Sequence, residues 1–332
     1  MTEGPAGSQS PAVPVPVERI AAVVVTHDRQ GPLAQTVTRL LAEALDHVIV
    51  VDNASTDGTA DWLAGQTDVR LHVIRLAENR GGAGGFAEGI RQTVALFDPD
   101  WVVVMDDDAR PEPGAVAWFR AMDKAGVGAV AAAVYRTEGG ICDMNRPAVN
   151  PFWNCKAFMQ TLMGGGRLGF HLADSAFKGE VRPIDVASFV GLFLSRAAIA
   201  ATGLPDGRLF IYGDDVLYSL SMRRAGVVVV FAPLLRFEHD FKTFEAASRA
   251  FKPLWKTYYH HRNQLMVYHS AAGLLFWPAL LLILPKWLMK ARHYGPDRGR
   301  YLRLLGLAIG DAMRGKLDRS HPDVVERASR GA

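Results

Sequence analysis

The sequence predicts an α/β fold in which a mostly parallel central sheet is flanked by helices. Short runs of Val, Ile and Ala that are apolar at almost every position recur along the first half of the chain. Each run is followed by a stretch with the 3.6-residue apolar period of an amphipathic helix. Strands that are apolar on both faces and separated by single helices are typical of βαβ units around a parallel sheet.

Four such pairs of strand and helix are expected before residue 123. In a sheet of this kind, ligands bind at the carboxyl ends of the strands, so the residues that follow each strand are the first candidates for a functional site. The expected strands are 20–26, 47–53, 69–75 and 101–106, and the helices that follow them are 32–45, 59–65, 84–97 and 112–122.

The regular pattern stops between about Ile141 and Pro183, where glycines and scattered polar residues replace it. We interpret this stretch as loops that cover the edge of the sheet above a substrate. A strand is expected to return at 186–196. A helix at 214–226, begun by acidic residues and closed by a glycine, and a buried strand at 227–233 follow it.

The chain has 332 residues, of which 49% are hydrophobic, enough for one large domain or two smaller ones. Residues 1–18 are rich in Pro, Gly and Ser and lack the apolar core of an export signal, so we expect a disordered leader and a cytoplasmic protein. Cys142 and Cys155 are too few for a disulfide framework and do not have metal-site spacing. We expect an α/β domain over 19–250 and a basic helical region over 251–332.

Charge is distributed unevenly along the chain. The net charge is +3, but from Phe241 onward 16 Lys and Arg stand against 6 Asp and Glu, a local net charge of +10. Such a distribution predicts that the C-terminal region meets an anionic partner. Nucleic acid and a phospholipid surface are the two obvious candidates.

An apolar run in this region favours the phospholipid. Ala271–Leu284 is fourteen uncharged residues long, about 21 Å as a helix, whereas the hydrocarbon of a bilayer is about 30 Å thick. Trp277, Trp287, Lys286 and Lys290 lie in or beside the run, as in segments that lie flat in an anionic membrane interface. The alternative is a helix packed on the α/β domain.

The strongest chemical signal is the segment VVVMDDDARPEP, in which Asp106, Asp107 and Asp108 leave the end of an expected strand. Asp106 and Asp108 project to the same side, so two carboxylates can bind one Mg²⁺ or Mn²⁺ while other positions stay free for diphosphate oxygens. The alternative is a solvated turn before the helix at Glu112. The location at the carboxyl edge of the sheet favours a metal site.

Polar residues also follow the first two strands. Asp52 and Asn53 end the second strand, where a carboxylate or an amide can pair with a nucleobase or a ribose, although helix capping selects the same residue types. Thr26 and Arg29 come after the first strand and are expected to face the same crevice.

The segment ENRGGAGGFAEG contains a glycine pattern that is typical of dinucleotide binding. Gly82, Gly84 and Ala87 fit GxGxxA, but the pattern follows the third strand rather than the first and is preceded by Asn79. On these residues alone, an NAD-dependent oxidoreductase and a metal-dependent enzyme that acts on a phosphate-bearing substrate both remain open.

The tetrapeptide YGDD, which includes Asp214 and Asp215, also occurs in the palm of many RNA-dependent polymerases. A complete template-directed polymerase would be unusually small at this length. The acidic pair also begins an expected helix instead of joining the triple aspartate in one motif. We therefore expect no nucleic acid among the partners.

Taken in order, five segments resemble a known family. VVTHDR, VVDNASTDGT, NRGGAGGF, MDDDARPEP and YGDDVLYSLSMRRAG are similar to the inverting GT-A glycosyltransferases of family 2, particularly the galactofuranosyltransferase and rhamnosyltransferase-like branch. The resemblance covers about 20–240. It implies a GT-A fold for the domain 19–250, with a Rossmann-like sheet.

The resemblance also implies roles for individual residues. Asp106 and Asp108 would be the outer positions of a DxD motif that binds a divalent cation and the diphosphate, and His239 would complete the metal site. Asp215 would be the general base, with Asp214 as the first alternative. The residues expected to bind the donor are Thr26, Arg29, Asp52, Asn53, Asn79, Gly82, Asp106 and Asp107.

The implied reaction is sugar transfer from a nucleotide sugar with Mn²⁺ or Mg²⁺. The resemblance favours galactofuranose from UDP-galactofuranose, with rhamnose from dTDP-rhamnose as the alternative. The acceptor would be a polysaccharide or a polyprenyl-linked glycan at the cytoplasmic face of the membrane. An NAD-dependent oxidoreductase would leave the triple aspartate unexplained, and the intact aspartates argue against a non-catalytic membrane-binding relative. Nothing in the sequence predicts an oligomeric state.

Overall fold

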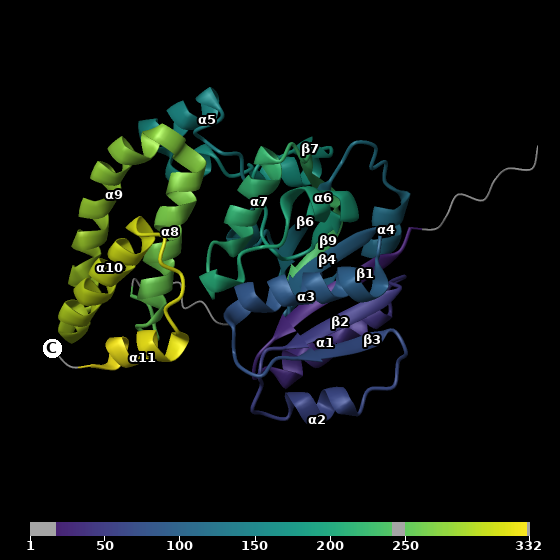
Figure 1. The fold of residues 1–332 in the computed structure, drawn as a ribbon. Coiled ribbons are helices and arrows are strands. Elements are labelled where there is room, and N and C mark those ends of the chain that lie inside the picture. Colours follow the sequence, from purple (N-terminus) through teal and green to yellow (C-terminus); the bar gives the residue numbers. More distant parts are fainter. Residues whose placement is uncertain (1–17, 241–249, 331–332) are drawn as a thin grey trace, which may run out of the picture.

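The computed structural model describes residues 18–240 and 250–330. A sheet covered by helices on both faces occupies the first range, and a group of long helices from the second range lies beside it (Figure 1). Residues 1–17 of the predicted leader lie outside the described residues. Glu18, the last residue of that prediction, is part of the fold, because its side chain lies 3.2 Å from Nζ of Lys124.

One half of the sheet is parallel, as predicted. The strands β1 (Ile20–Thr26), β2 (His47–Asp52), β3 (Leu71–Arg75) and β4 (Trp101–Asp106) lie in the order β3-β2-β1-β4. The predicted bounds of β1 and β4 are confirmed, and those of β2 and β3 differ by one or two residues. Because these four strands are parallel, their carboxyl ends meet at a single edge of the sheet.

The other half of the sheet is mixed. Antiparallel to β4 lies β8 (Leu192–Ser195), followed by β6 (Ala129–Arg136), β9 (Val229–His239) and β5 (Ala109–Pro111). The short β7 (Arg182–Pro183) pairs with β9. The sequence did not reveal β6 because its run is rich in alanine, a poor strand former.

The strand predicted at 186–196 is wrong over its first half. Only β8 is extended, because Gly191 takes a left-handed φ of 69° and turns the chain just before it. The strand predicted at 227–233 is longer than expected. It continues as β9 to His239, which carries that histidine to the end of a strand.

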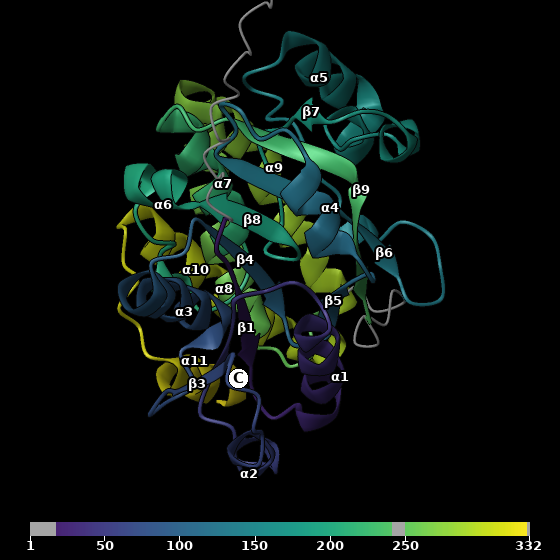
Figure 2. The ribbon, with the colours of Figure 1, turned by 90° about the vertical axis from the view of Figure 1, so that its right-hand side faces the viewer.

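Helices cover both faces of the sheet (Figure 2). One face packs on Leu33, Val37 and Phe119, and the other on Phe86 and Tyr218. The first face is covered by α1 (Gln30–Leu41), α2 (Thr59–Ala64) and α4 (Ala115–Ala121), and the second by α3 (Gly81–Phe97), α6 (Arg196–Thr202) and α7 (Asp214–Arg224).

The glycines of α3 allow it to lie unusually close to β1. A Cβ atom on Gly85 would stand 2.4 Å from Cγ1 of Val25, and one on Gly89 would stand 2.5 Å from Cγ1 of Val23. Neither position has room for a side chain. Close packing of a helix on a strand is sufficient to account for this part of the glycine-rich segment, without a dinucleotide.

The stretch between β6 and β8 is irregular, as predicted, but includes one short α-helix, α5 (Cys155–Gln160). It lies at the top of Figure 1, beside the turn between the first two C-terminal helices. Asn150 fixes it there by donating from Nδ2 to the carbonyl of Ala271, 3.0 Å away. Short helical turns occupy Asp143–Asn145, Thr161–Gly165, Gly166–Gly169 and Asp174–Lys178.

Four α-helices form the described part of the C-terminal region. They are α8 (Lys256–Ala272), α9 (Phe276–Lys290), α10 (Arg298–Met313) and α11 (His321–Ser329). By length and composition alone, the helical stretch Lys256–His293 is long and apolar enough to cross a membrane. Gly273 divides it, however, because its φ of 54° ends α8, and α9 then runs back beside α8 (Figure 1).

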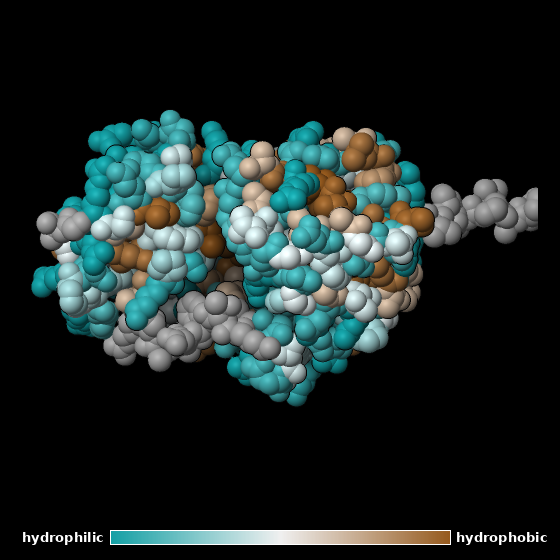
Figure 3. All heavy atoms as spheres, turned by 90° about the horizontal axis from the view of Figure 1, so that it is seen from below, coloured by the Kyte–Doolittle hydropathy of each residue, from teal (hydrophilic) through white to brown (hydrophobic). Residues whose placement is uncertain are grey.

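The predicted apolar run therefore continues from the end of α8 into α9, where it has two sides. Phe276 and Trp287 are buried against the other C-terminal helices. On the other side, Leu281 is 75% exposed and Leu282 is 63% exposed. Seen from below, the surface is hollowed between the helical region and the sheet domain, and hydrophobic residues gather in patches on both (Figure 3).

Candidate active site

The triple aspartate and His239 meet because two strands pair. Asp106 ends β4, and the antiparallel ladder between β5 and β9 sets Ala109 opposite His239. This register brings Nε2 of His239 to 3.1 Å from Oδ1 of Asp108. One ligand atom from each of Asp106, Asp108 and His239 lies within 4.8 Å of the others. The three residues predicted as metal ligands are thus brought together.

His239 is oriented by a residue that the sequence did not reveal. Nδ1 of His239 lies 2.8 Å from Oδ1 of Asn145, to which it donates, so Nε2 faces Asp108. Asn145 in turn donates from Nδ2 to Oγ of Ser188, 3.0 Å away. Asn145 lies in the irregular stretch after β6, 94 residues before His239, and no local motif marks it.

Thr26 and Arg29 contact the middle and last aspartates of the triple. Oγ1 of Thr26 donates to Oδ2 of Asp107 at 2.7 Å. The guanidinium of Arg29 spans two carboxylates, at 3.3 Å from Asp107 and 2.8 Å from Asp108. Asp107 is 3% exposed, and Thr26 and Arg29 both contact its carboxylate.

Burial and neighbouring charges shift the pKa values of Asp106, Asp108 and His239. Burial, together with the neighbouring Asp108 carboxylate, raises the pKa of Asp106 to about 7. Burial opposes ionisation of Asp108, but His239 and Arg29 outweigh it and lower the pKa of that carboxyl. Burial alone would lower the pKa of His239, whereas its hydrogen bond to Asp108 raises it to about 10. Two carboxylates and an imidazole are a donor set that fits a divalent cation.

The acidic pair lies in the first turn of α7, after Gly213, whose φ is 76°. Oδ1 of Asp215 accepts a hydrogen bond from the backbone N–H of Val216 at 2.7 Å. Burial raises the pKa of both Asp214 and Asp215, and each of them shares this electrostatic environment with Asp106. Asp106 and the acidic pair are therefore near enough for their carboxylates to repel one another.

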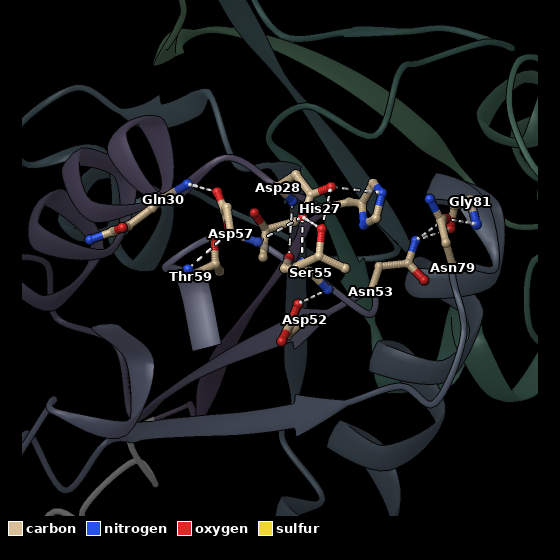
Figure 4. Close-up of polar contacts among 12 residues, drawn as sticks. His27, Asp28, Gln30, Asp52, Asn53, Ser55, Asp57, Thr59, Asn79 and Gly81 are labelled. Carbon is tan, nitrogen blue, oxygen red and sulfur yellow. Dashed lines mark hydrogen bonds and ion pairs between the residues drawn. The ribbon is translucent and has the colours of Figure 1, made fainter. Parts of the chain in front are cut away.

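A cavity of about 480 Å³ opens where β2 and β3 end. Ser55 and Arg75 line it and both contact Asp52. Oδ1 of Asp52 accepts from the N–H of Ser55, whereas Oδ2, 3.6 Å from Nε of Arg75, accepts no hydrogen bond from any described residue. Figure 4 shows Asp52 and Ser55 among polar side chains that link the loops after β1 and β2.

Two of the predicted donor-binding residues, Asn53 and Asn79, contact the start of α3 (Figure 4). Asn53 donates from Nδ2 to Oδ1 of Asn79 at 3.1 Å and to the carbonyl of Gly81 at 3.0 Å. Its Oδ1 accepts from the N–H of Arg80. Both polar atoms of the Asn53 side chain and Oδ1 of Asn79 thus bond to the protein itself. Gly82 lies in the first turn of α3, where the neighbouring N–H groups of Arg80, Gly81 and Ala83 already donate to acceptors of the protein.

This fold and this site define a glycosyltransferase. Residues 21–176 match the model of the family described as Glycosyl transferase family 2, and this part of the chain is a family 2 glycosyltransferase domain. An oxidoreductase is not supported by this match.

Two galactofuranosyltransferases are among the proteins similar to this chain. Galactofuranosyltransferase GlfT1 of Mycolicibacterium smegmatis is 28% identical over 282 residues, which cover 82% of this chain and 88% of that protein. GlfT1 of Mycobacterium tuberculosis is 32% identical over 219 residues, which cover 63% of this chain and 66% of that protein.

The solved structure of GalNAc-T7 with UDP, GalNAc and Mn²⁺ shares the fold. Its TM-score is 0.53 at 13% identity, and the match covers 76% of this chain. The matched part is about half of that chain, 48%. This similarity supports the predicted GT-A fold of the sheet domain.

Proposed function

We propose that the protein transfers galactofuranose from UDP-galactofuranose to a hydroxyl group of a lipid-linked or polysaccharide acceptor, with inversion at the anomeric carbon. The observation that carries this proposal is the meeting of Asp106, Asp108 and His239 within 4.8 Å, in one electrostatic environment with the acidic pair of α7. The printed activity of the two mycobacterial relatives supports galactofuranose.

Asp106, Asp108 and His239 are proposed to hold the cation, which we assign as Mn²⁺ or Mg²⁺. The presence of Mn²⁺ in the GalNAc-T7 structure supports manganese. When bound, a divalent cation neutralises the charge that develops on a diphosphate leaving group. Arg29, which pairs with Asp107 and Asp108, adds positive charge to the proposed diphosphate site.

Asp215 is proposed as the general base. Its Oδ1 already accepts the N–H of Val216, which leaves Oδ2 for the acceptor hydroxyl. Because burial raises its pKa, this carboxylate is a stronger base than an exposed aspartate. It takes the hydroxyl proton while the acceptor oxygen bonds to the anomeric carbon and the bond to the diphosphate breaks. A single displacement of this kind inverts the configuration.

The nucleotide is proposed to lie in the cavity beside Asp52. Oδ2 of Asp52 accepts no hydrogen bond from the described residues and can accept the imide N–H of a uracil ring, and Arg75, which pairs with it at 3.6 Å, lies at the same cavity. Thymine carries the same N–H, so this contact admits dTDP-rhamnose as well. The two donors also differ in the transferred sugar and in the ribose, and the transfer assay below distinguishes them.

The acceptor is proposed to be presented at the cytoplasmic face of a membrane. The outer side of α9 exposes Trp277 at 57% and Leu281 at 75%, within a region of net charge +10 from residue 241 onward. An amphipathic helix with an exposed apolar side and basic neighbours is suited to lie in an anionic interface. A peripheral attachment of this kind would place the active site beside a lipid-linked substrate.

The test is a transfer assay with purified protein and a membrane-lipid extract as the source of acceptor. UDP-galactofuranose and dTDP-rhamnose are supplied separately with Mn²⁺, and nucleotide release and the anomeric configuration of the product are measured. We expect turnover of UDP-galactofuranose, its loss on chelation of the metal, and an inverted product. Faster turnover of dTDP-rhamnose would replace the sugar assignment, and turnover that survives complete chelation would refute the metal site.

A further inference from the structure

The loop that leads into the acidic pair has an unusual backbone. Phe210 has a φ of 68° and Tyr212 a φ of 72°, although neither is a glycine. Gly213, with a φ of 76°, follows directly. Non-glycine residues in this region are disfavoured, and they persist only where the surrounding structure holds them. The loop 209–213 must therefore be fixed from outside.

One amide on α8 fixes most of it. Nδ2 of Asn263 lies 3.0 Å from the carbonyl oxygen of Leu209, 2.9 Å from that of Ile211 and 2.9 Å from that of Tyr212. Oδ1 of Asn263 accepts from Nε of Arg262 at 2.8 Å, so the amide can present only its N–H groups to the loop. Asn263 is fully buried.

Arg262 adds a second contact from the same turn of α8. Its Nη2 donates to the carbonyl of Leu209 at 2.9 Å, and its guanidinium lies 5.2 Å from the ring centres of both Tyr258 and Tyr259. Tyr258 donates to Oδ2 of Asp311 on α10 at 2.8 Å. The contact is thus braced by a second C-terminal helix, and Arg262 itself is fully buried.

The opposite side of the loop rests on the start of α3. The N–H of Ala83 donates to the carbonyl of Phe210 at 3.1 Å. A Cβ atom on Gly81 would stand 2.0 Å from that same oxygen, so the two backbones are in direct contact. The loop is therefore held between α8 and the start of α3.

We propose that Asn263 and Arg262 are positioning residues of the transfer reaction. By holding the carbonyls of the loop 209–213, they set the start of α7 and with it the carboxylate of Asp215 against the acceptor hydroxyl. The C-terminal helices are then part of the catalytic apparatus as well as a surface for a partner. This inference rests on the proposed role of Asp215 as the base.

The test replaces Asn263 with isosteric or smaller residues. Asn263→Leu has a similar shape but no N–H groups, and Asn263→Ser keeps a single donor. Tyr301→Phe is the matched control, since Tyr301 is a buried C-terminal residue that donates to the carbonyl of Trp287 and does not touch the loop. For each protein, kcat, the Kd and stoichiometry of UDP binding with Mn²⁺, and hydrogen exchange of the amides in 209–213 are measured.

We expect Asn263→Leu to lower kcat at least about tenfold, because small displacements of a catalytic group are costly, and Asn263→Ser to lie between it and the wild type. UDP binding should stay within about twofold of wild type with one site per chain, and exchange in 209–213 should quicken. A residue that only stabilises the fold would change the number of binding sites and the thermal stability while leaving kcat per site unchanged.

Two results would overturn the inference. One is an unchanged kcat in both Asn263 variants. The other is a loss of UDP-binding sites in Asn263→Ser that is proportional to its loss of activity. This second result tests the inference even if Asn263→Leu does not fold. Asp215→Asn separates this from a failure of the proposed base: if that variant is inactive and Asn263→Leu is fully active, the positioning role alone is wrong.

Discussion

Asp215→Asn is expected to separate activity from stability. The asparagine keeps the size of the side chain, and its Oδ1 can still accept the N–H of Val216, which lies 2.7 Å from the carboxylate in the wild type. The start of α7 should therefore remain as it is. The one property that is lost is the ability to take a proton from the acceptor hydroxyl.

The variant is expected to have a lower kcat but a higher free energy of unfolding than the wild type. A positioned general base contributes about 10²- to 10⁴-fold, so kcat should fall at least about a hundredfold, or about 2.7 kcal/mol in the barrier. Burial beside Asp214 raises the pKa of Asp215, so its ionised form destabilises the folded protein at neutral pH. A pKa difference of one between the folded and unfolded protein corresponds to about 1.4 kcal/mol. Removal of the charge should therefore stabilise the fold by about 1 to 3 kcal/mol.

The assay pairs turnover with urea unfolding at neutral pH, and UDP binding with Mn²⁺ serves as the control for an intact donor site. An inactive variant that binds UDP normally and unfolds at higher urea would agree with the reasoning. Turnover within about tenfold of wild type would refute Asp215 as the base and direct attention to Asp214. A large loss of stability would show that the carboxylate is structural.

Three further outcomes are expected. Asp108→Ala should abolish Mn²⁺-dependent binding of UDP, because it removes one of three ligands; calorimetry that gives an unchanged Kd and metal dependence would contradict the DxD assignment. The kcat of the wild type should fall with decreasing pH with a midpoint above about 4, the ordinary aspartate value, because the base must be ionised and burial raises its pKa; a midpoint at or below that value would contradict its burial. The protein should sediment with anionic liposomes, and more weakly at high salt. The double variant Leu281→Glu with Leu282→Glu should bind less. The control Val69→Glu, at a residue of the sheet domain that is 88% exposed, should bind as the wild type does. Equal loss in both variants, or no sedimentation of the wild type at low salt, would argue against α9 as the membrane surface.

The sequence predicted the parallel half of the sheet well, because burial on both faces leaves a continuous apolar run. The ends of β1 and β4 follow directly from IAAVVVT and WVVVMD. Prediction failed where long-range pairing overrides local preference. The alanine-rich run of β6 becomes a strand because β8 and β9 lie on either side of it. The left-handed conformation of Gly191, directly before β8, shortens the strand, and no sequence pattern reveals it.

The candidate site divides in the same way. Asp106, Asp108 and Asp215 could be found because each stands in a local motif at the end of a strand or the start of a helix. Asn145 and Asn263 could not, because their roles depend on partners 94 residues away in one case and on the carbonyls of a distant loop in the other. Asn263 also lies in the C-terminal region, whose composition predicts contact with a membrane and does not indicate a position beside the proposed catalytic loop.

The pairing of β5 with β9 has a consequence for the order in which the enzyme is made. Asp106 and Asp108 leave the ribosome well before His239, which lies 131 residues after Asp108, and β9 is needed to bring that histidine to the cluster. A nascent chain that ends before β9 therefore contains Asp106 and Asp108 but lacks the imidazole of His239. Full affinity for a cation should arise only late in synthesis, so that incomplete chains compete poorly with finished enzyme for the metal of the cell.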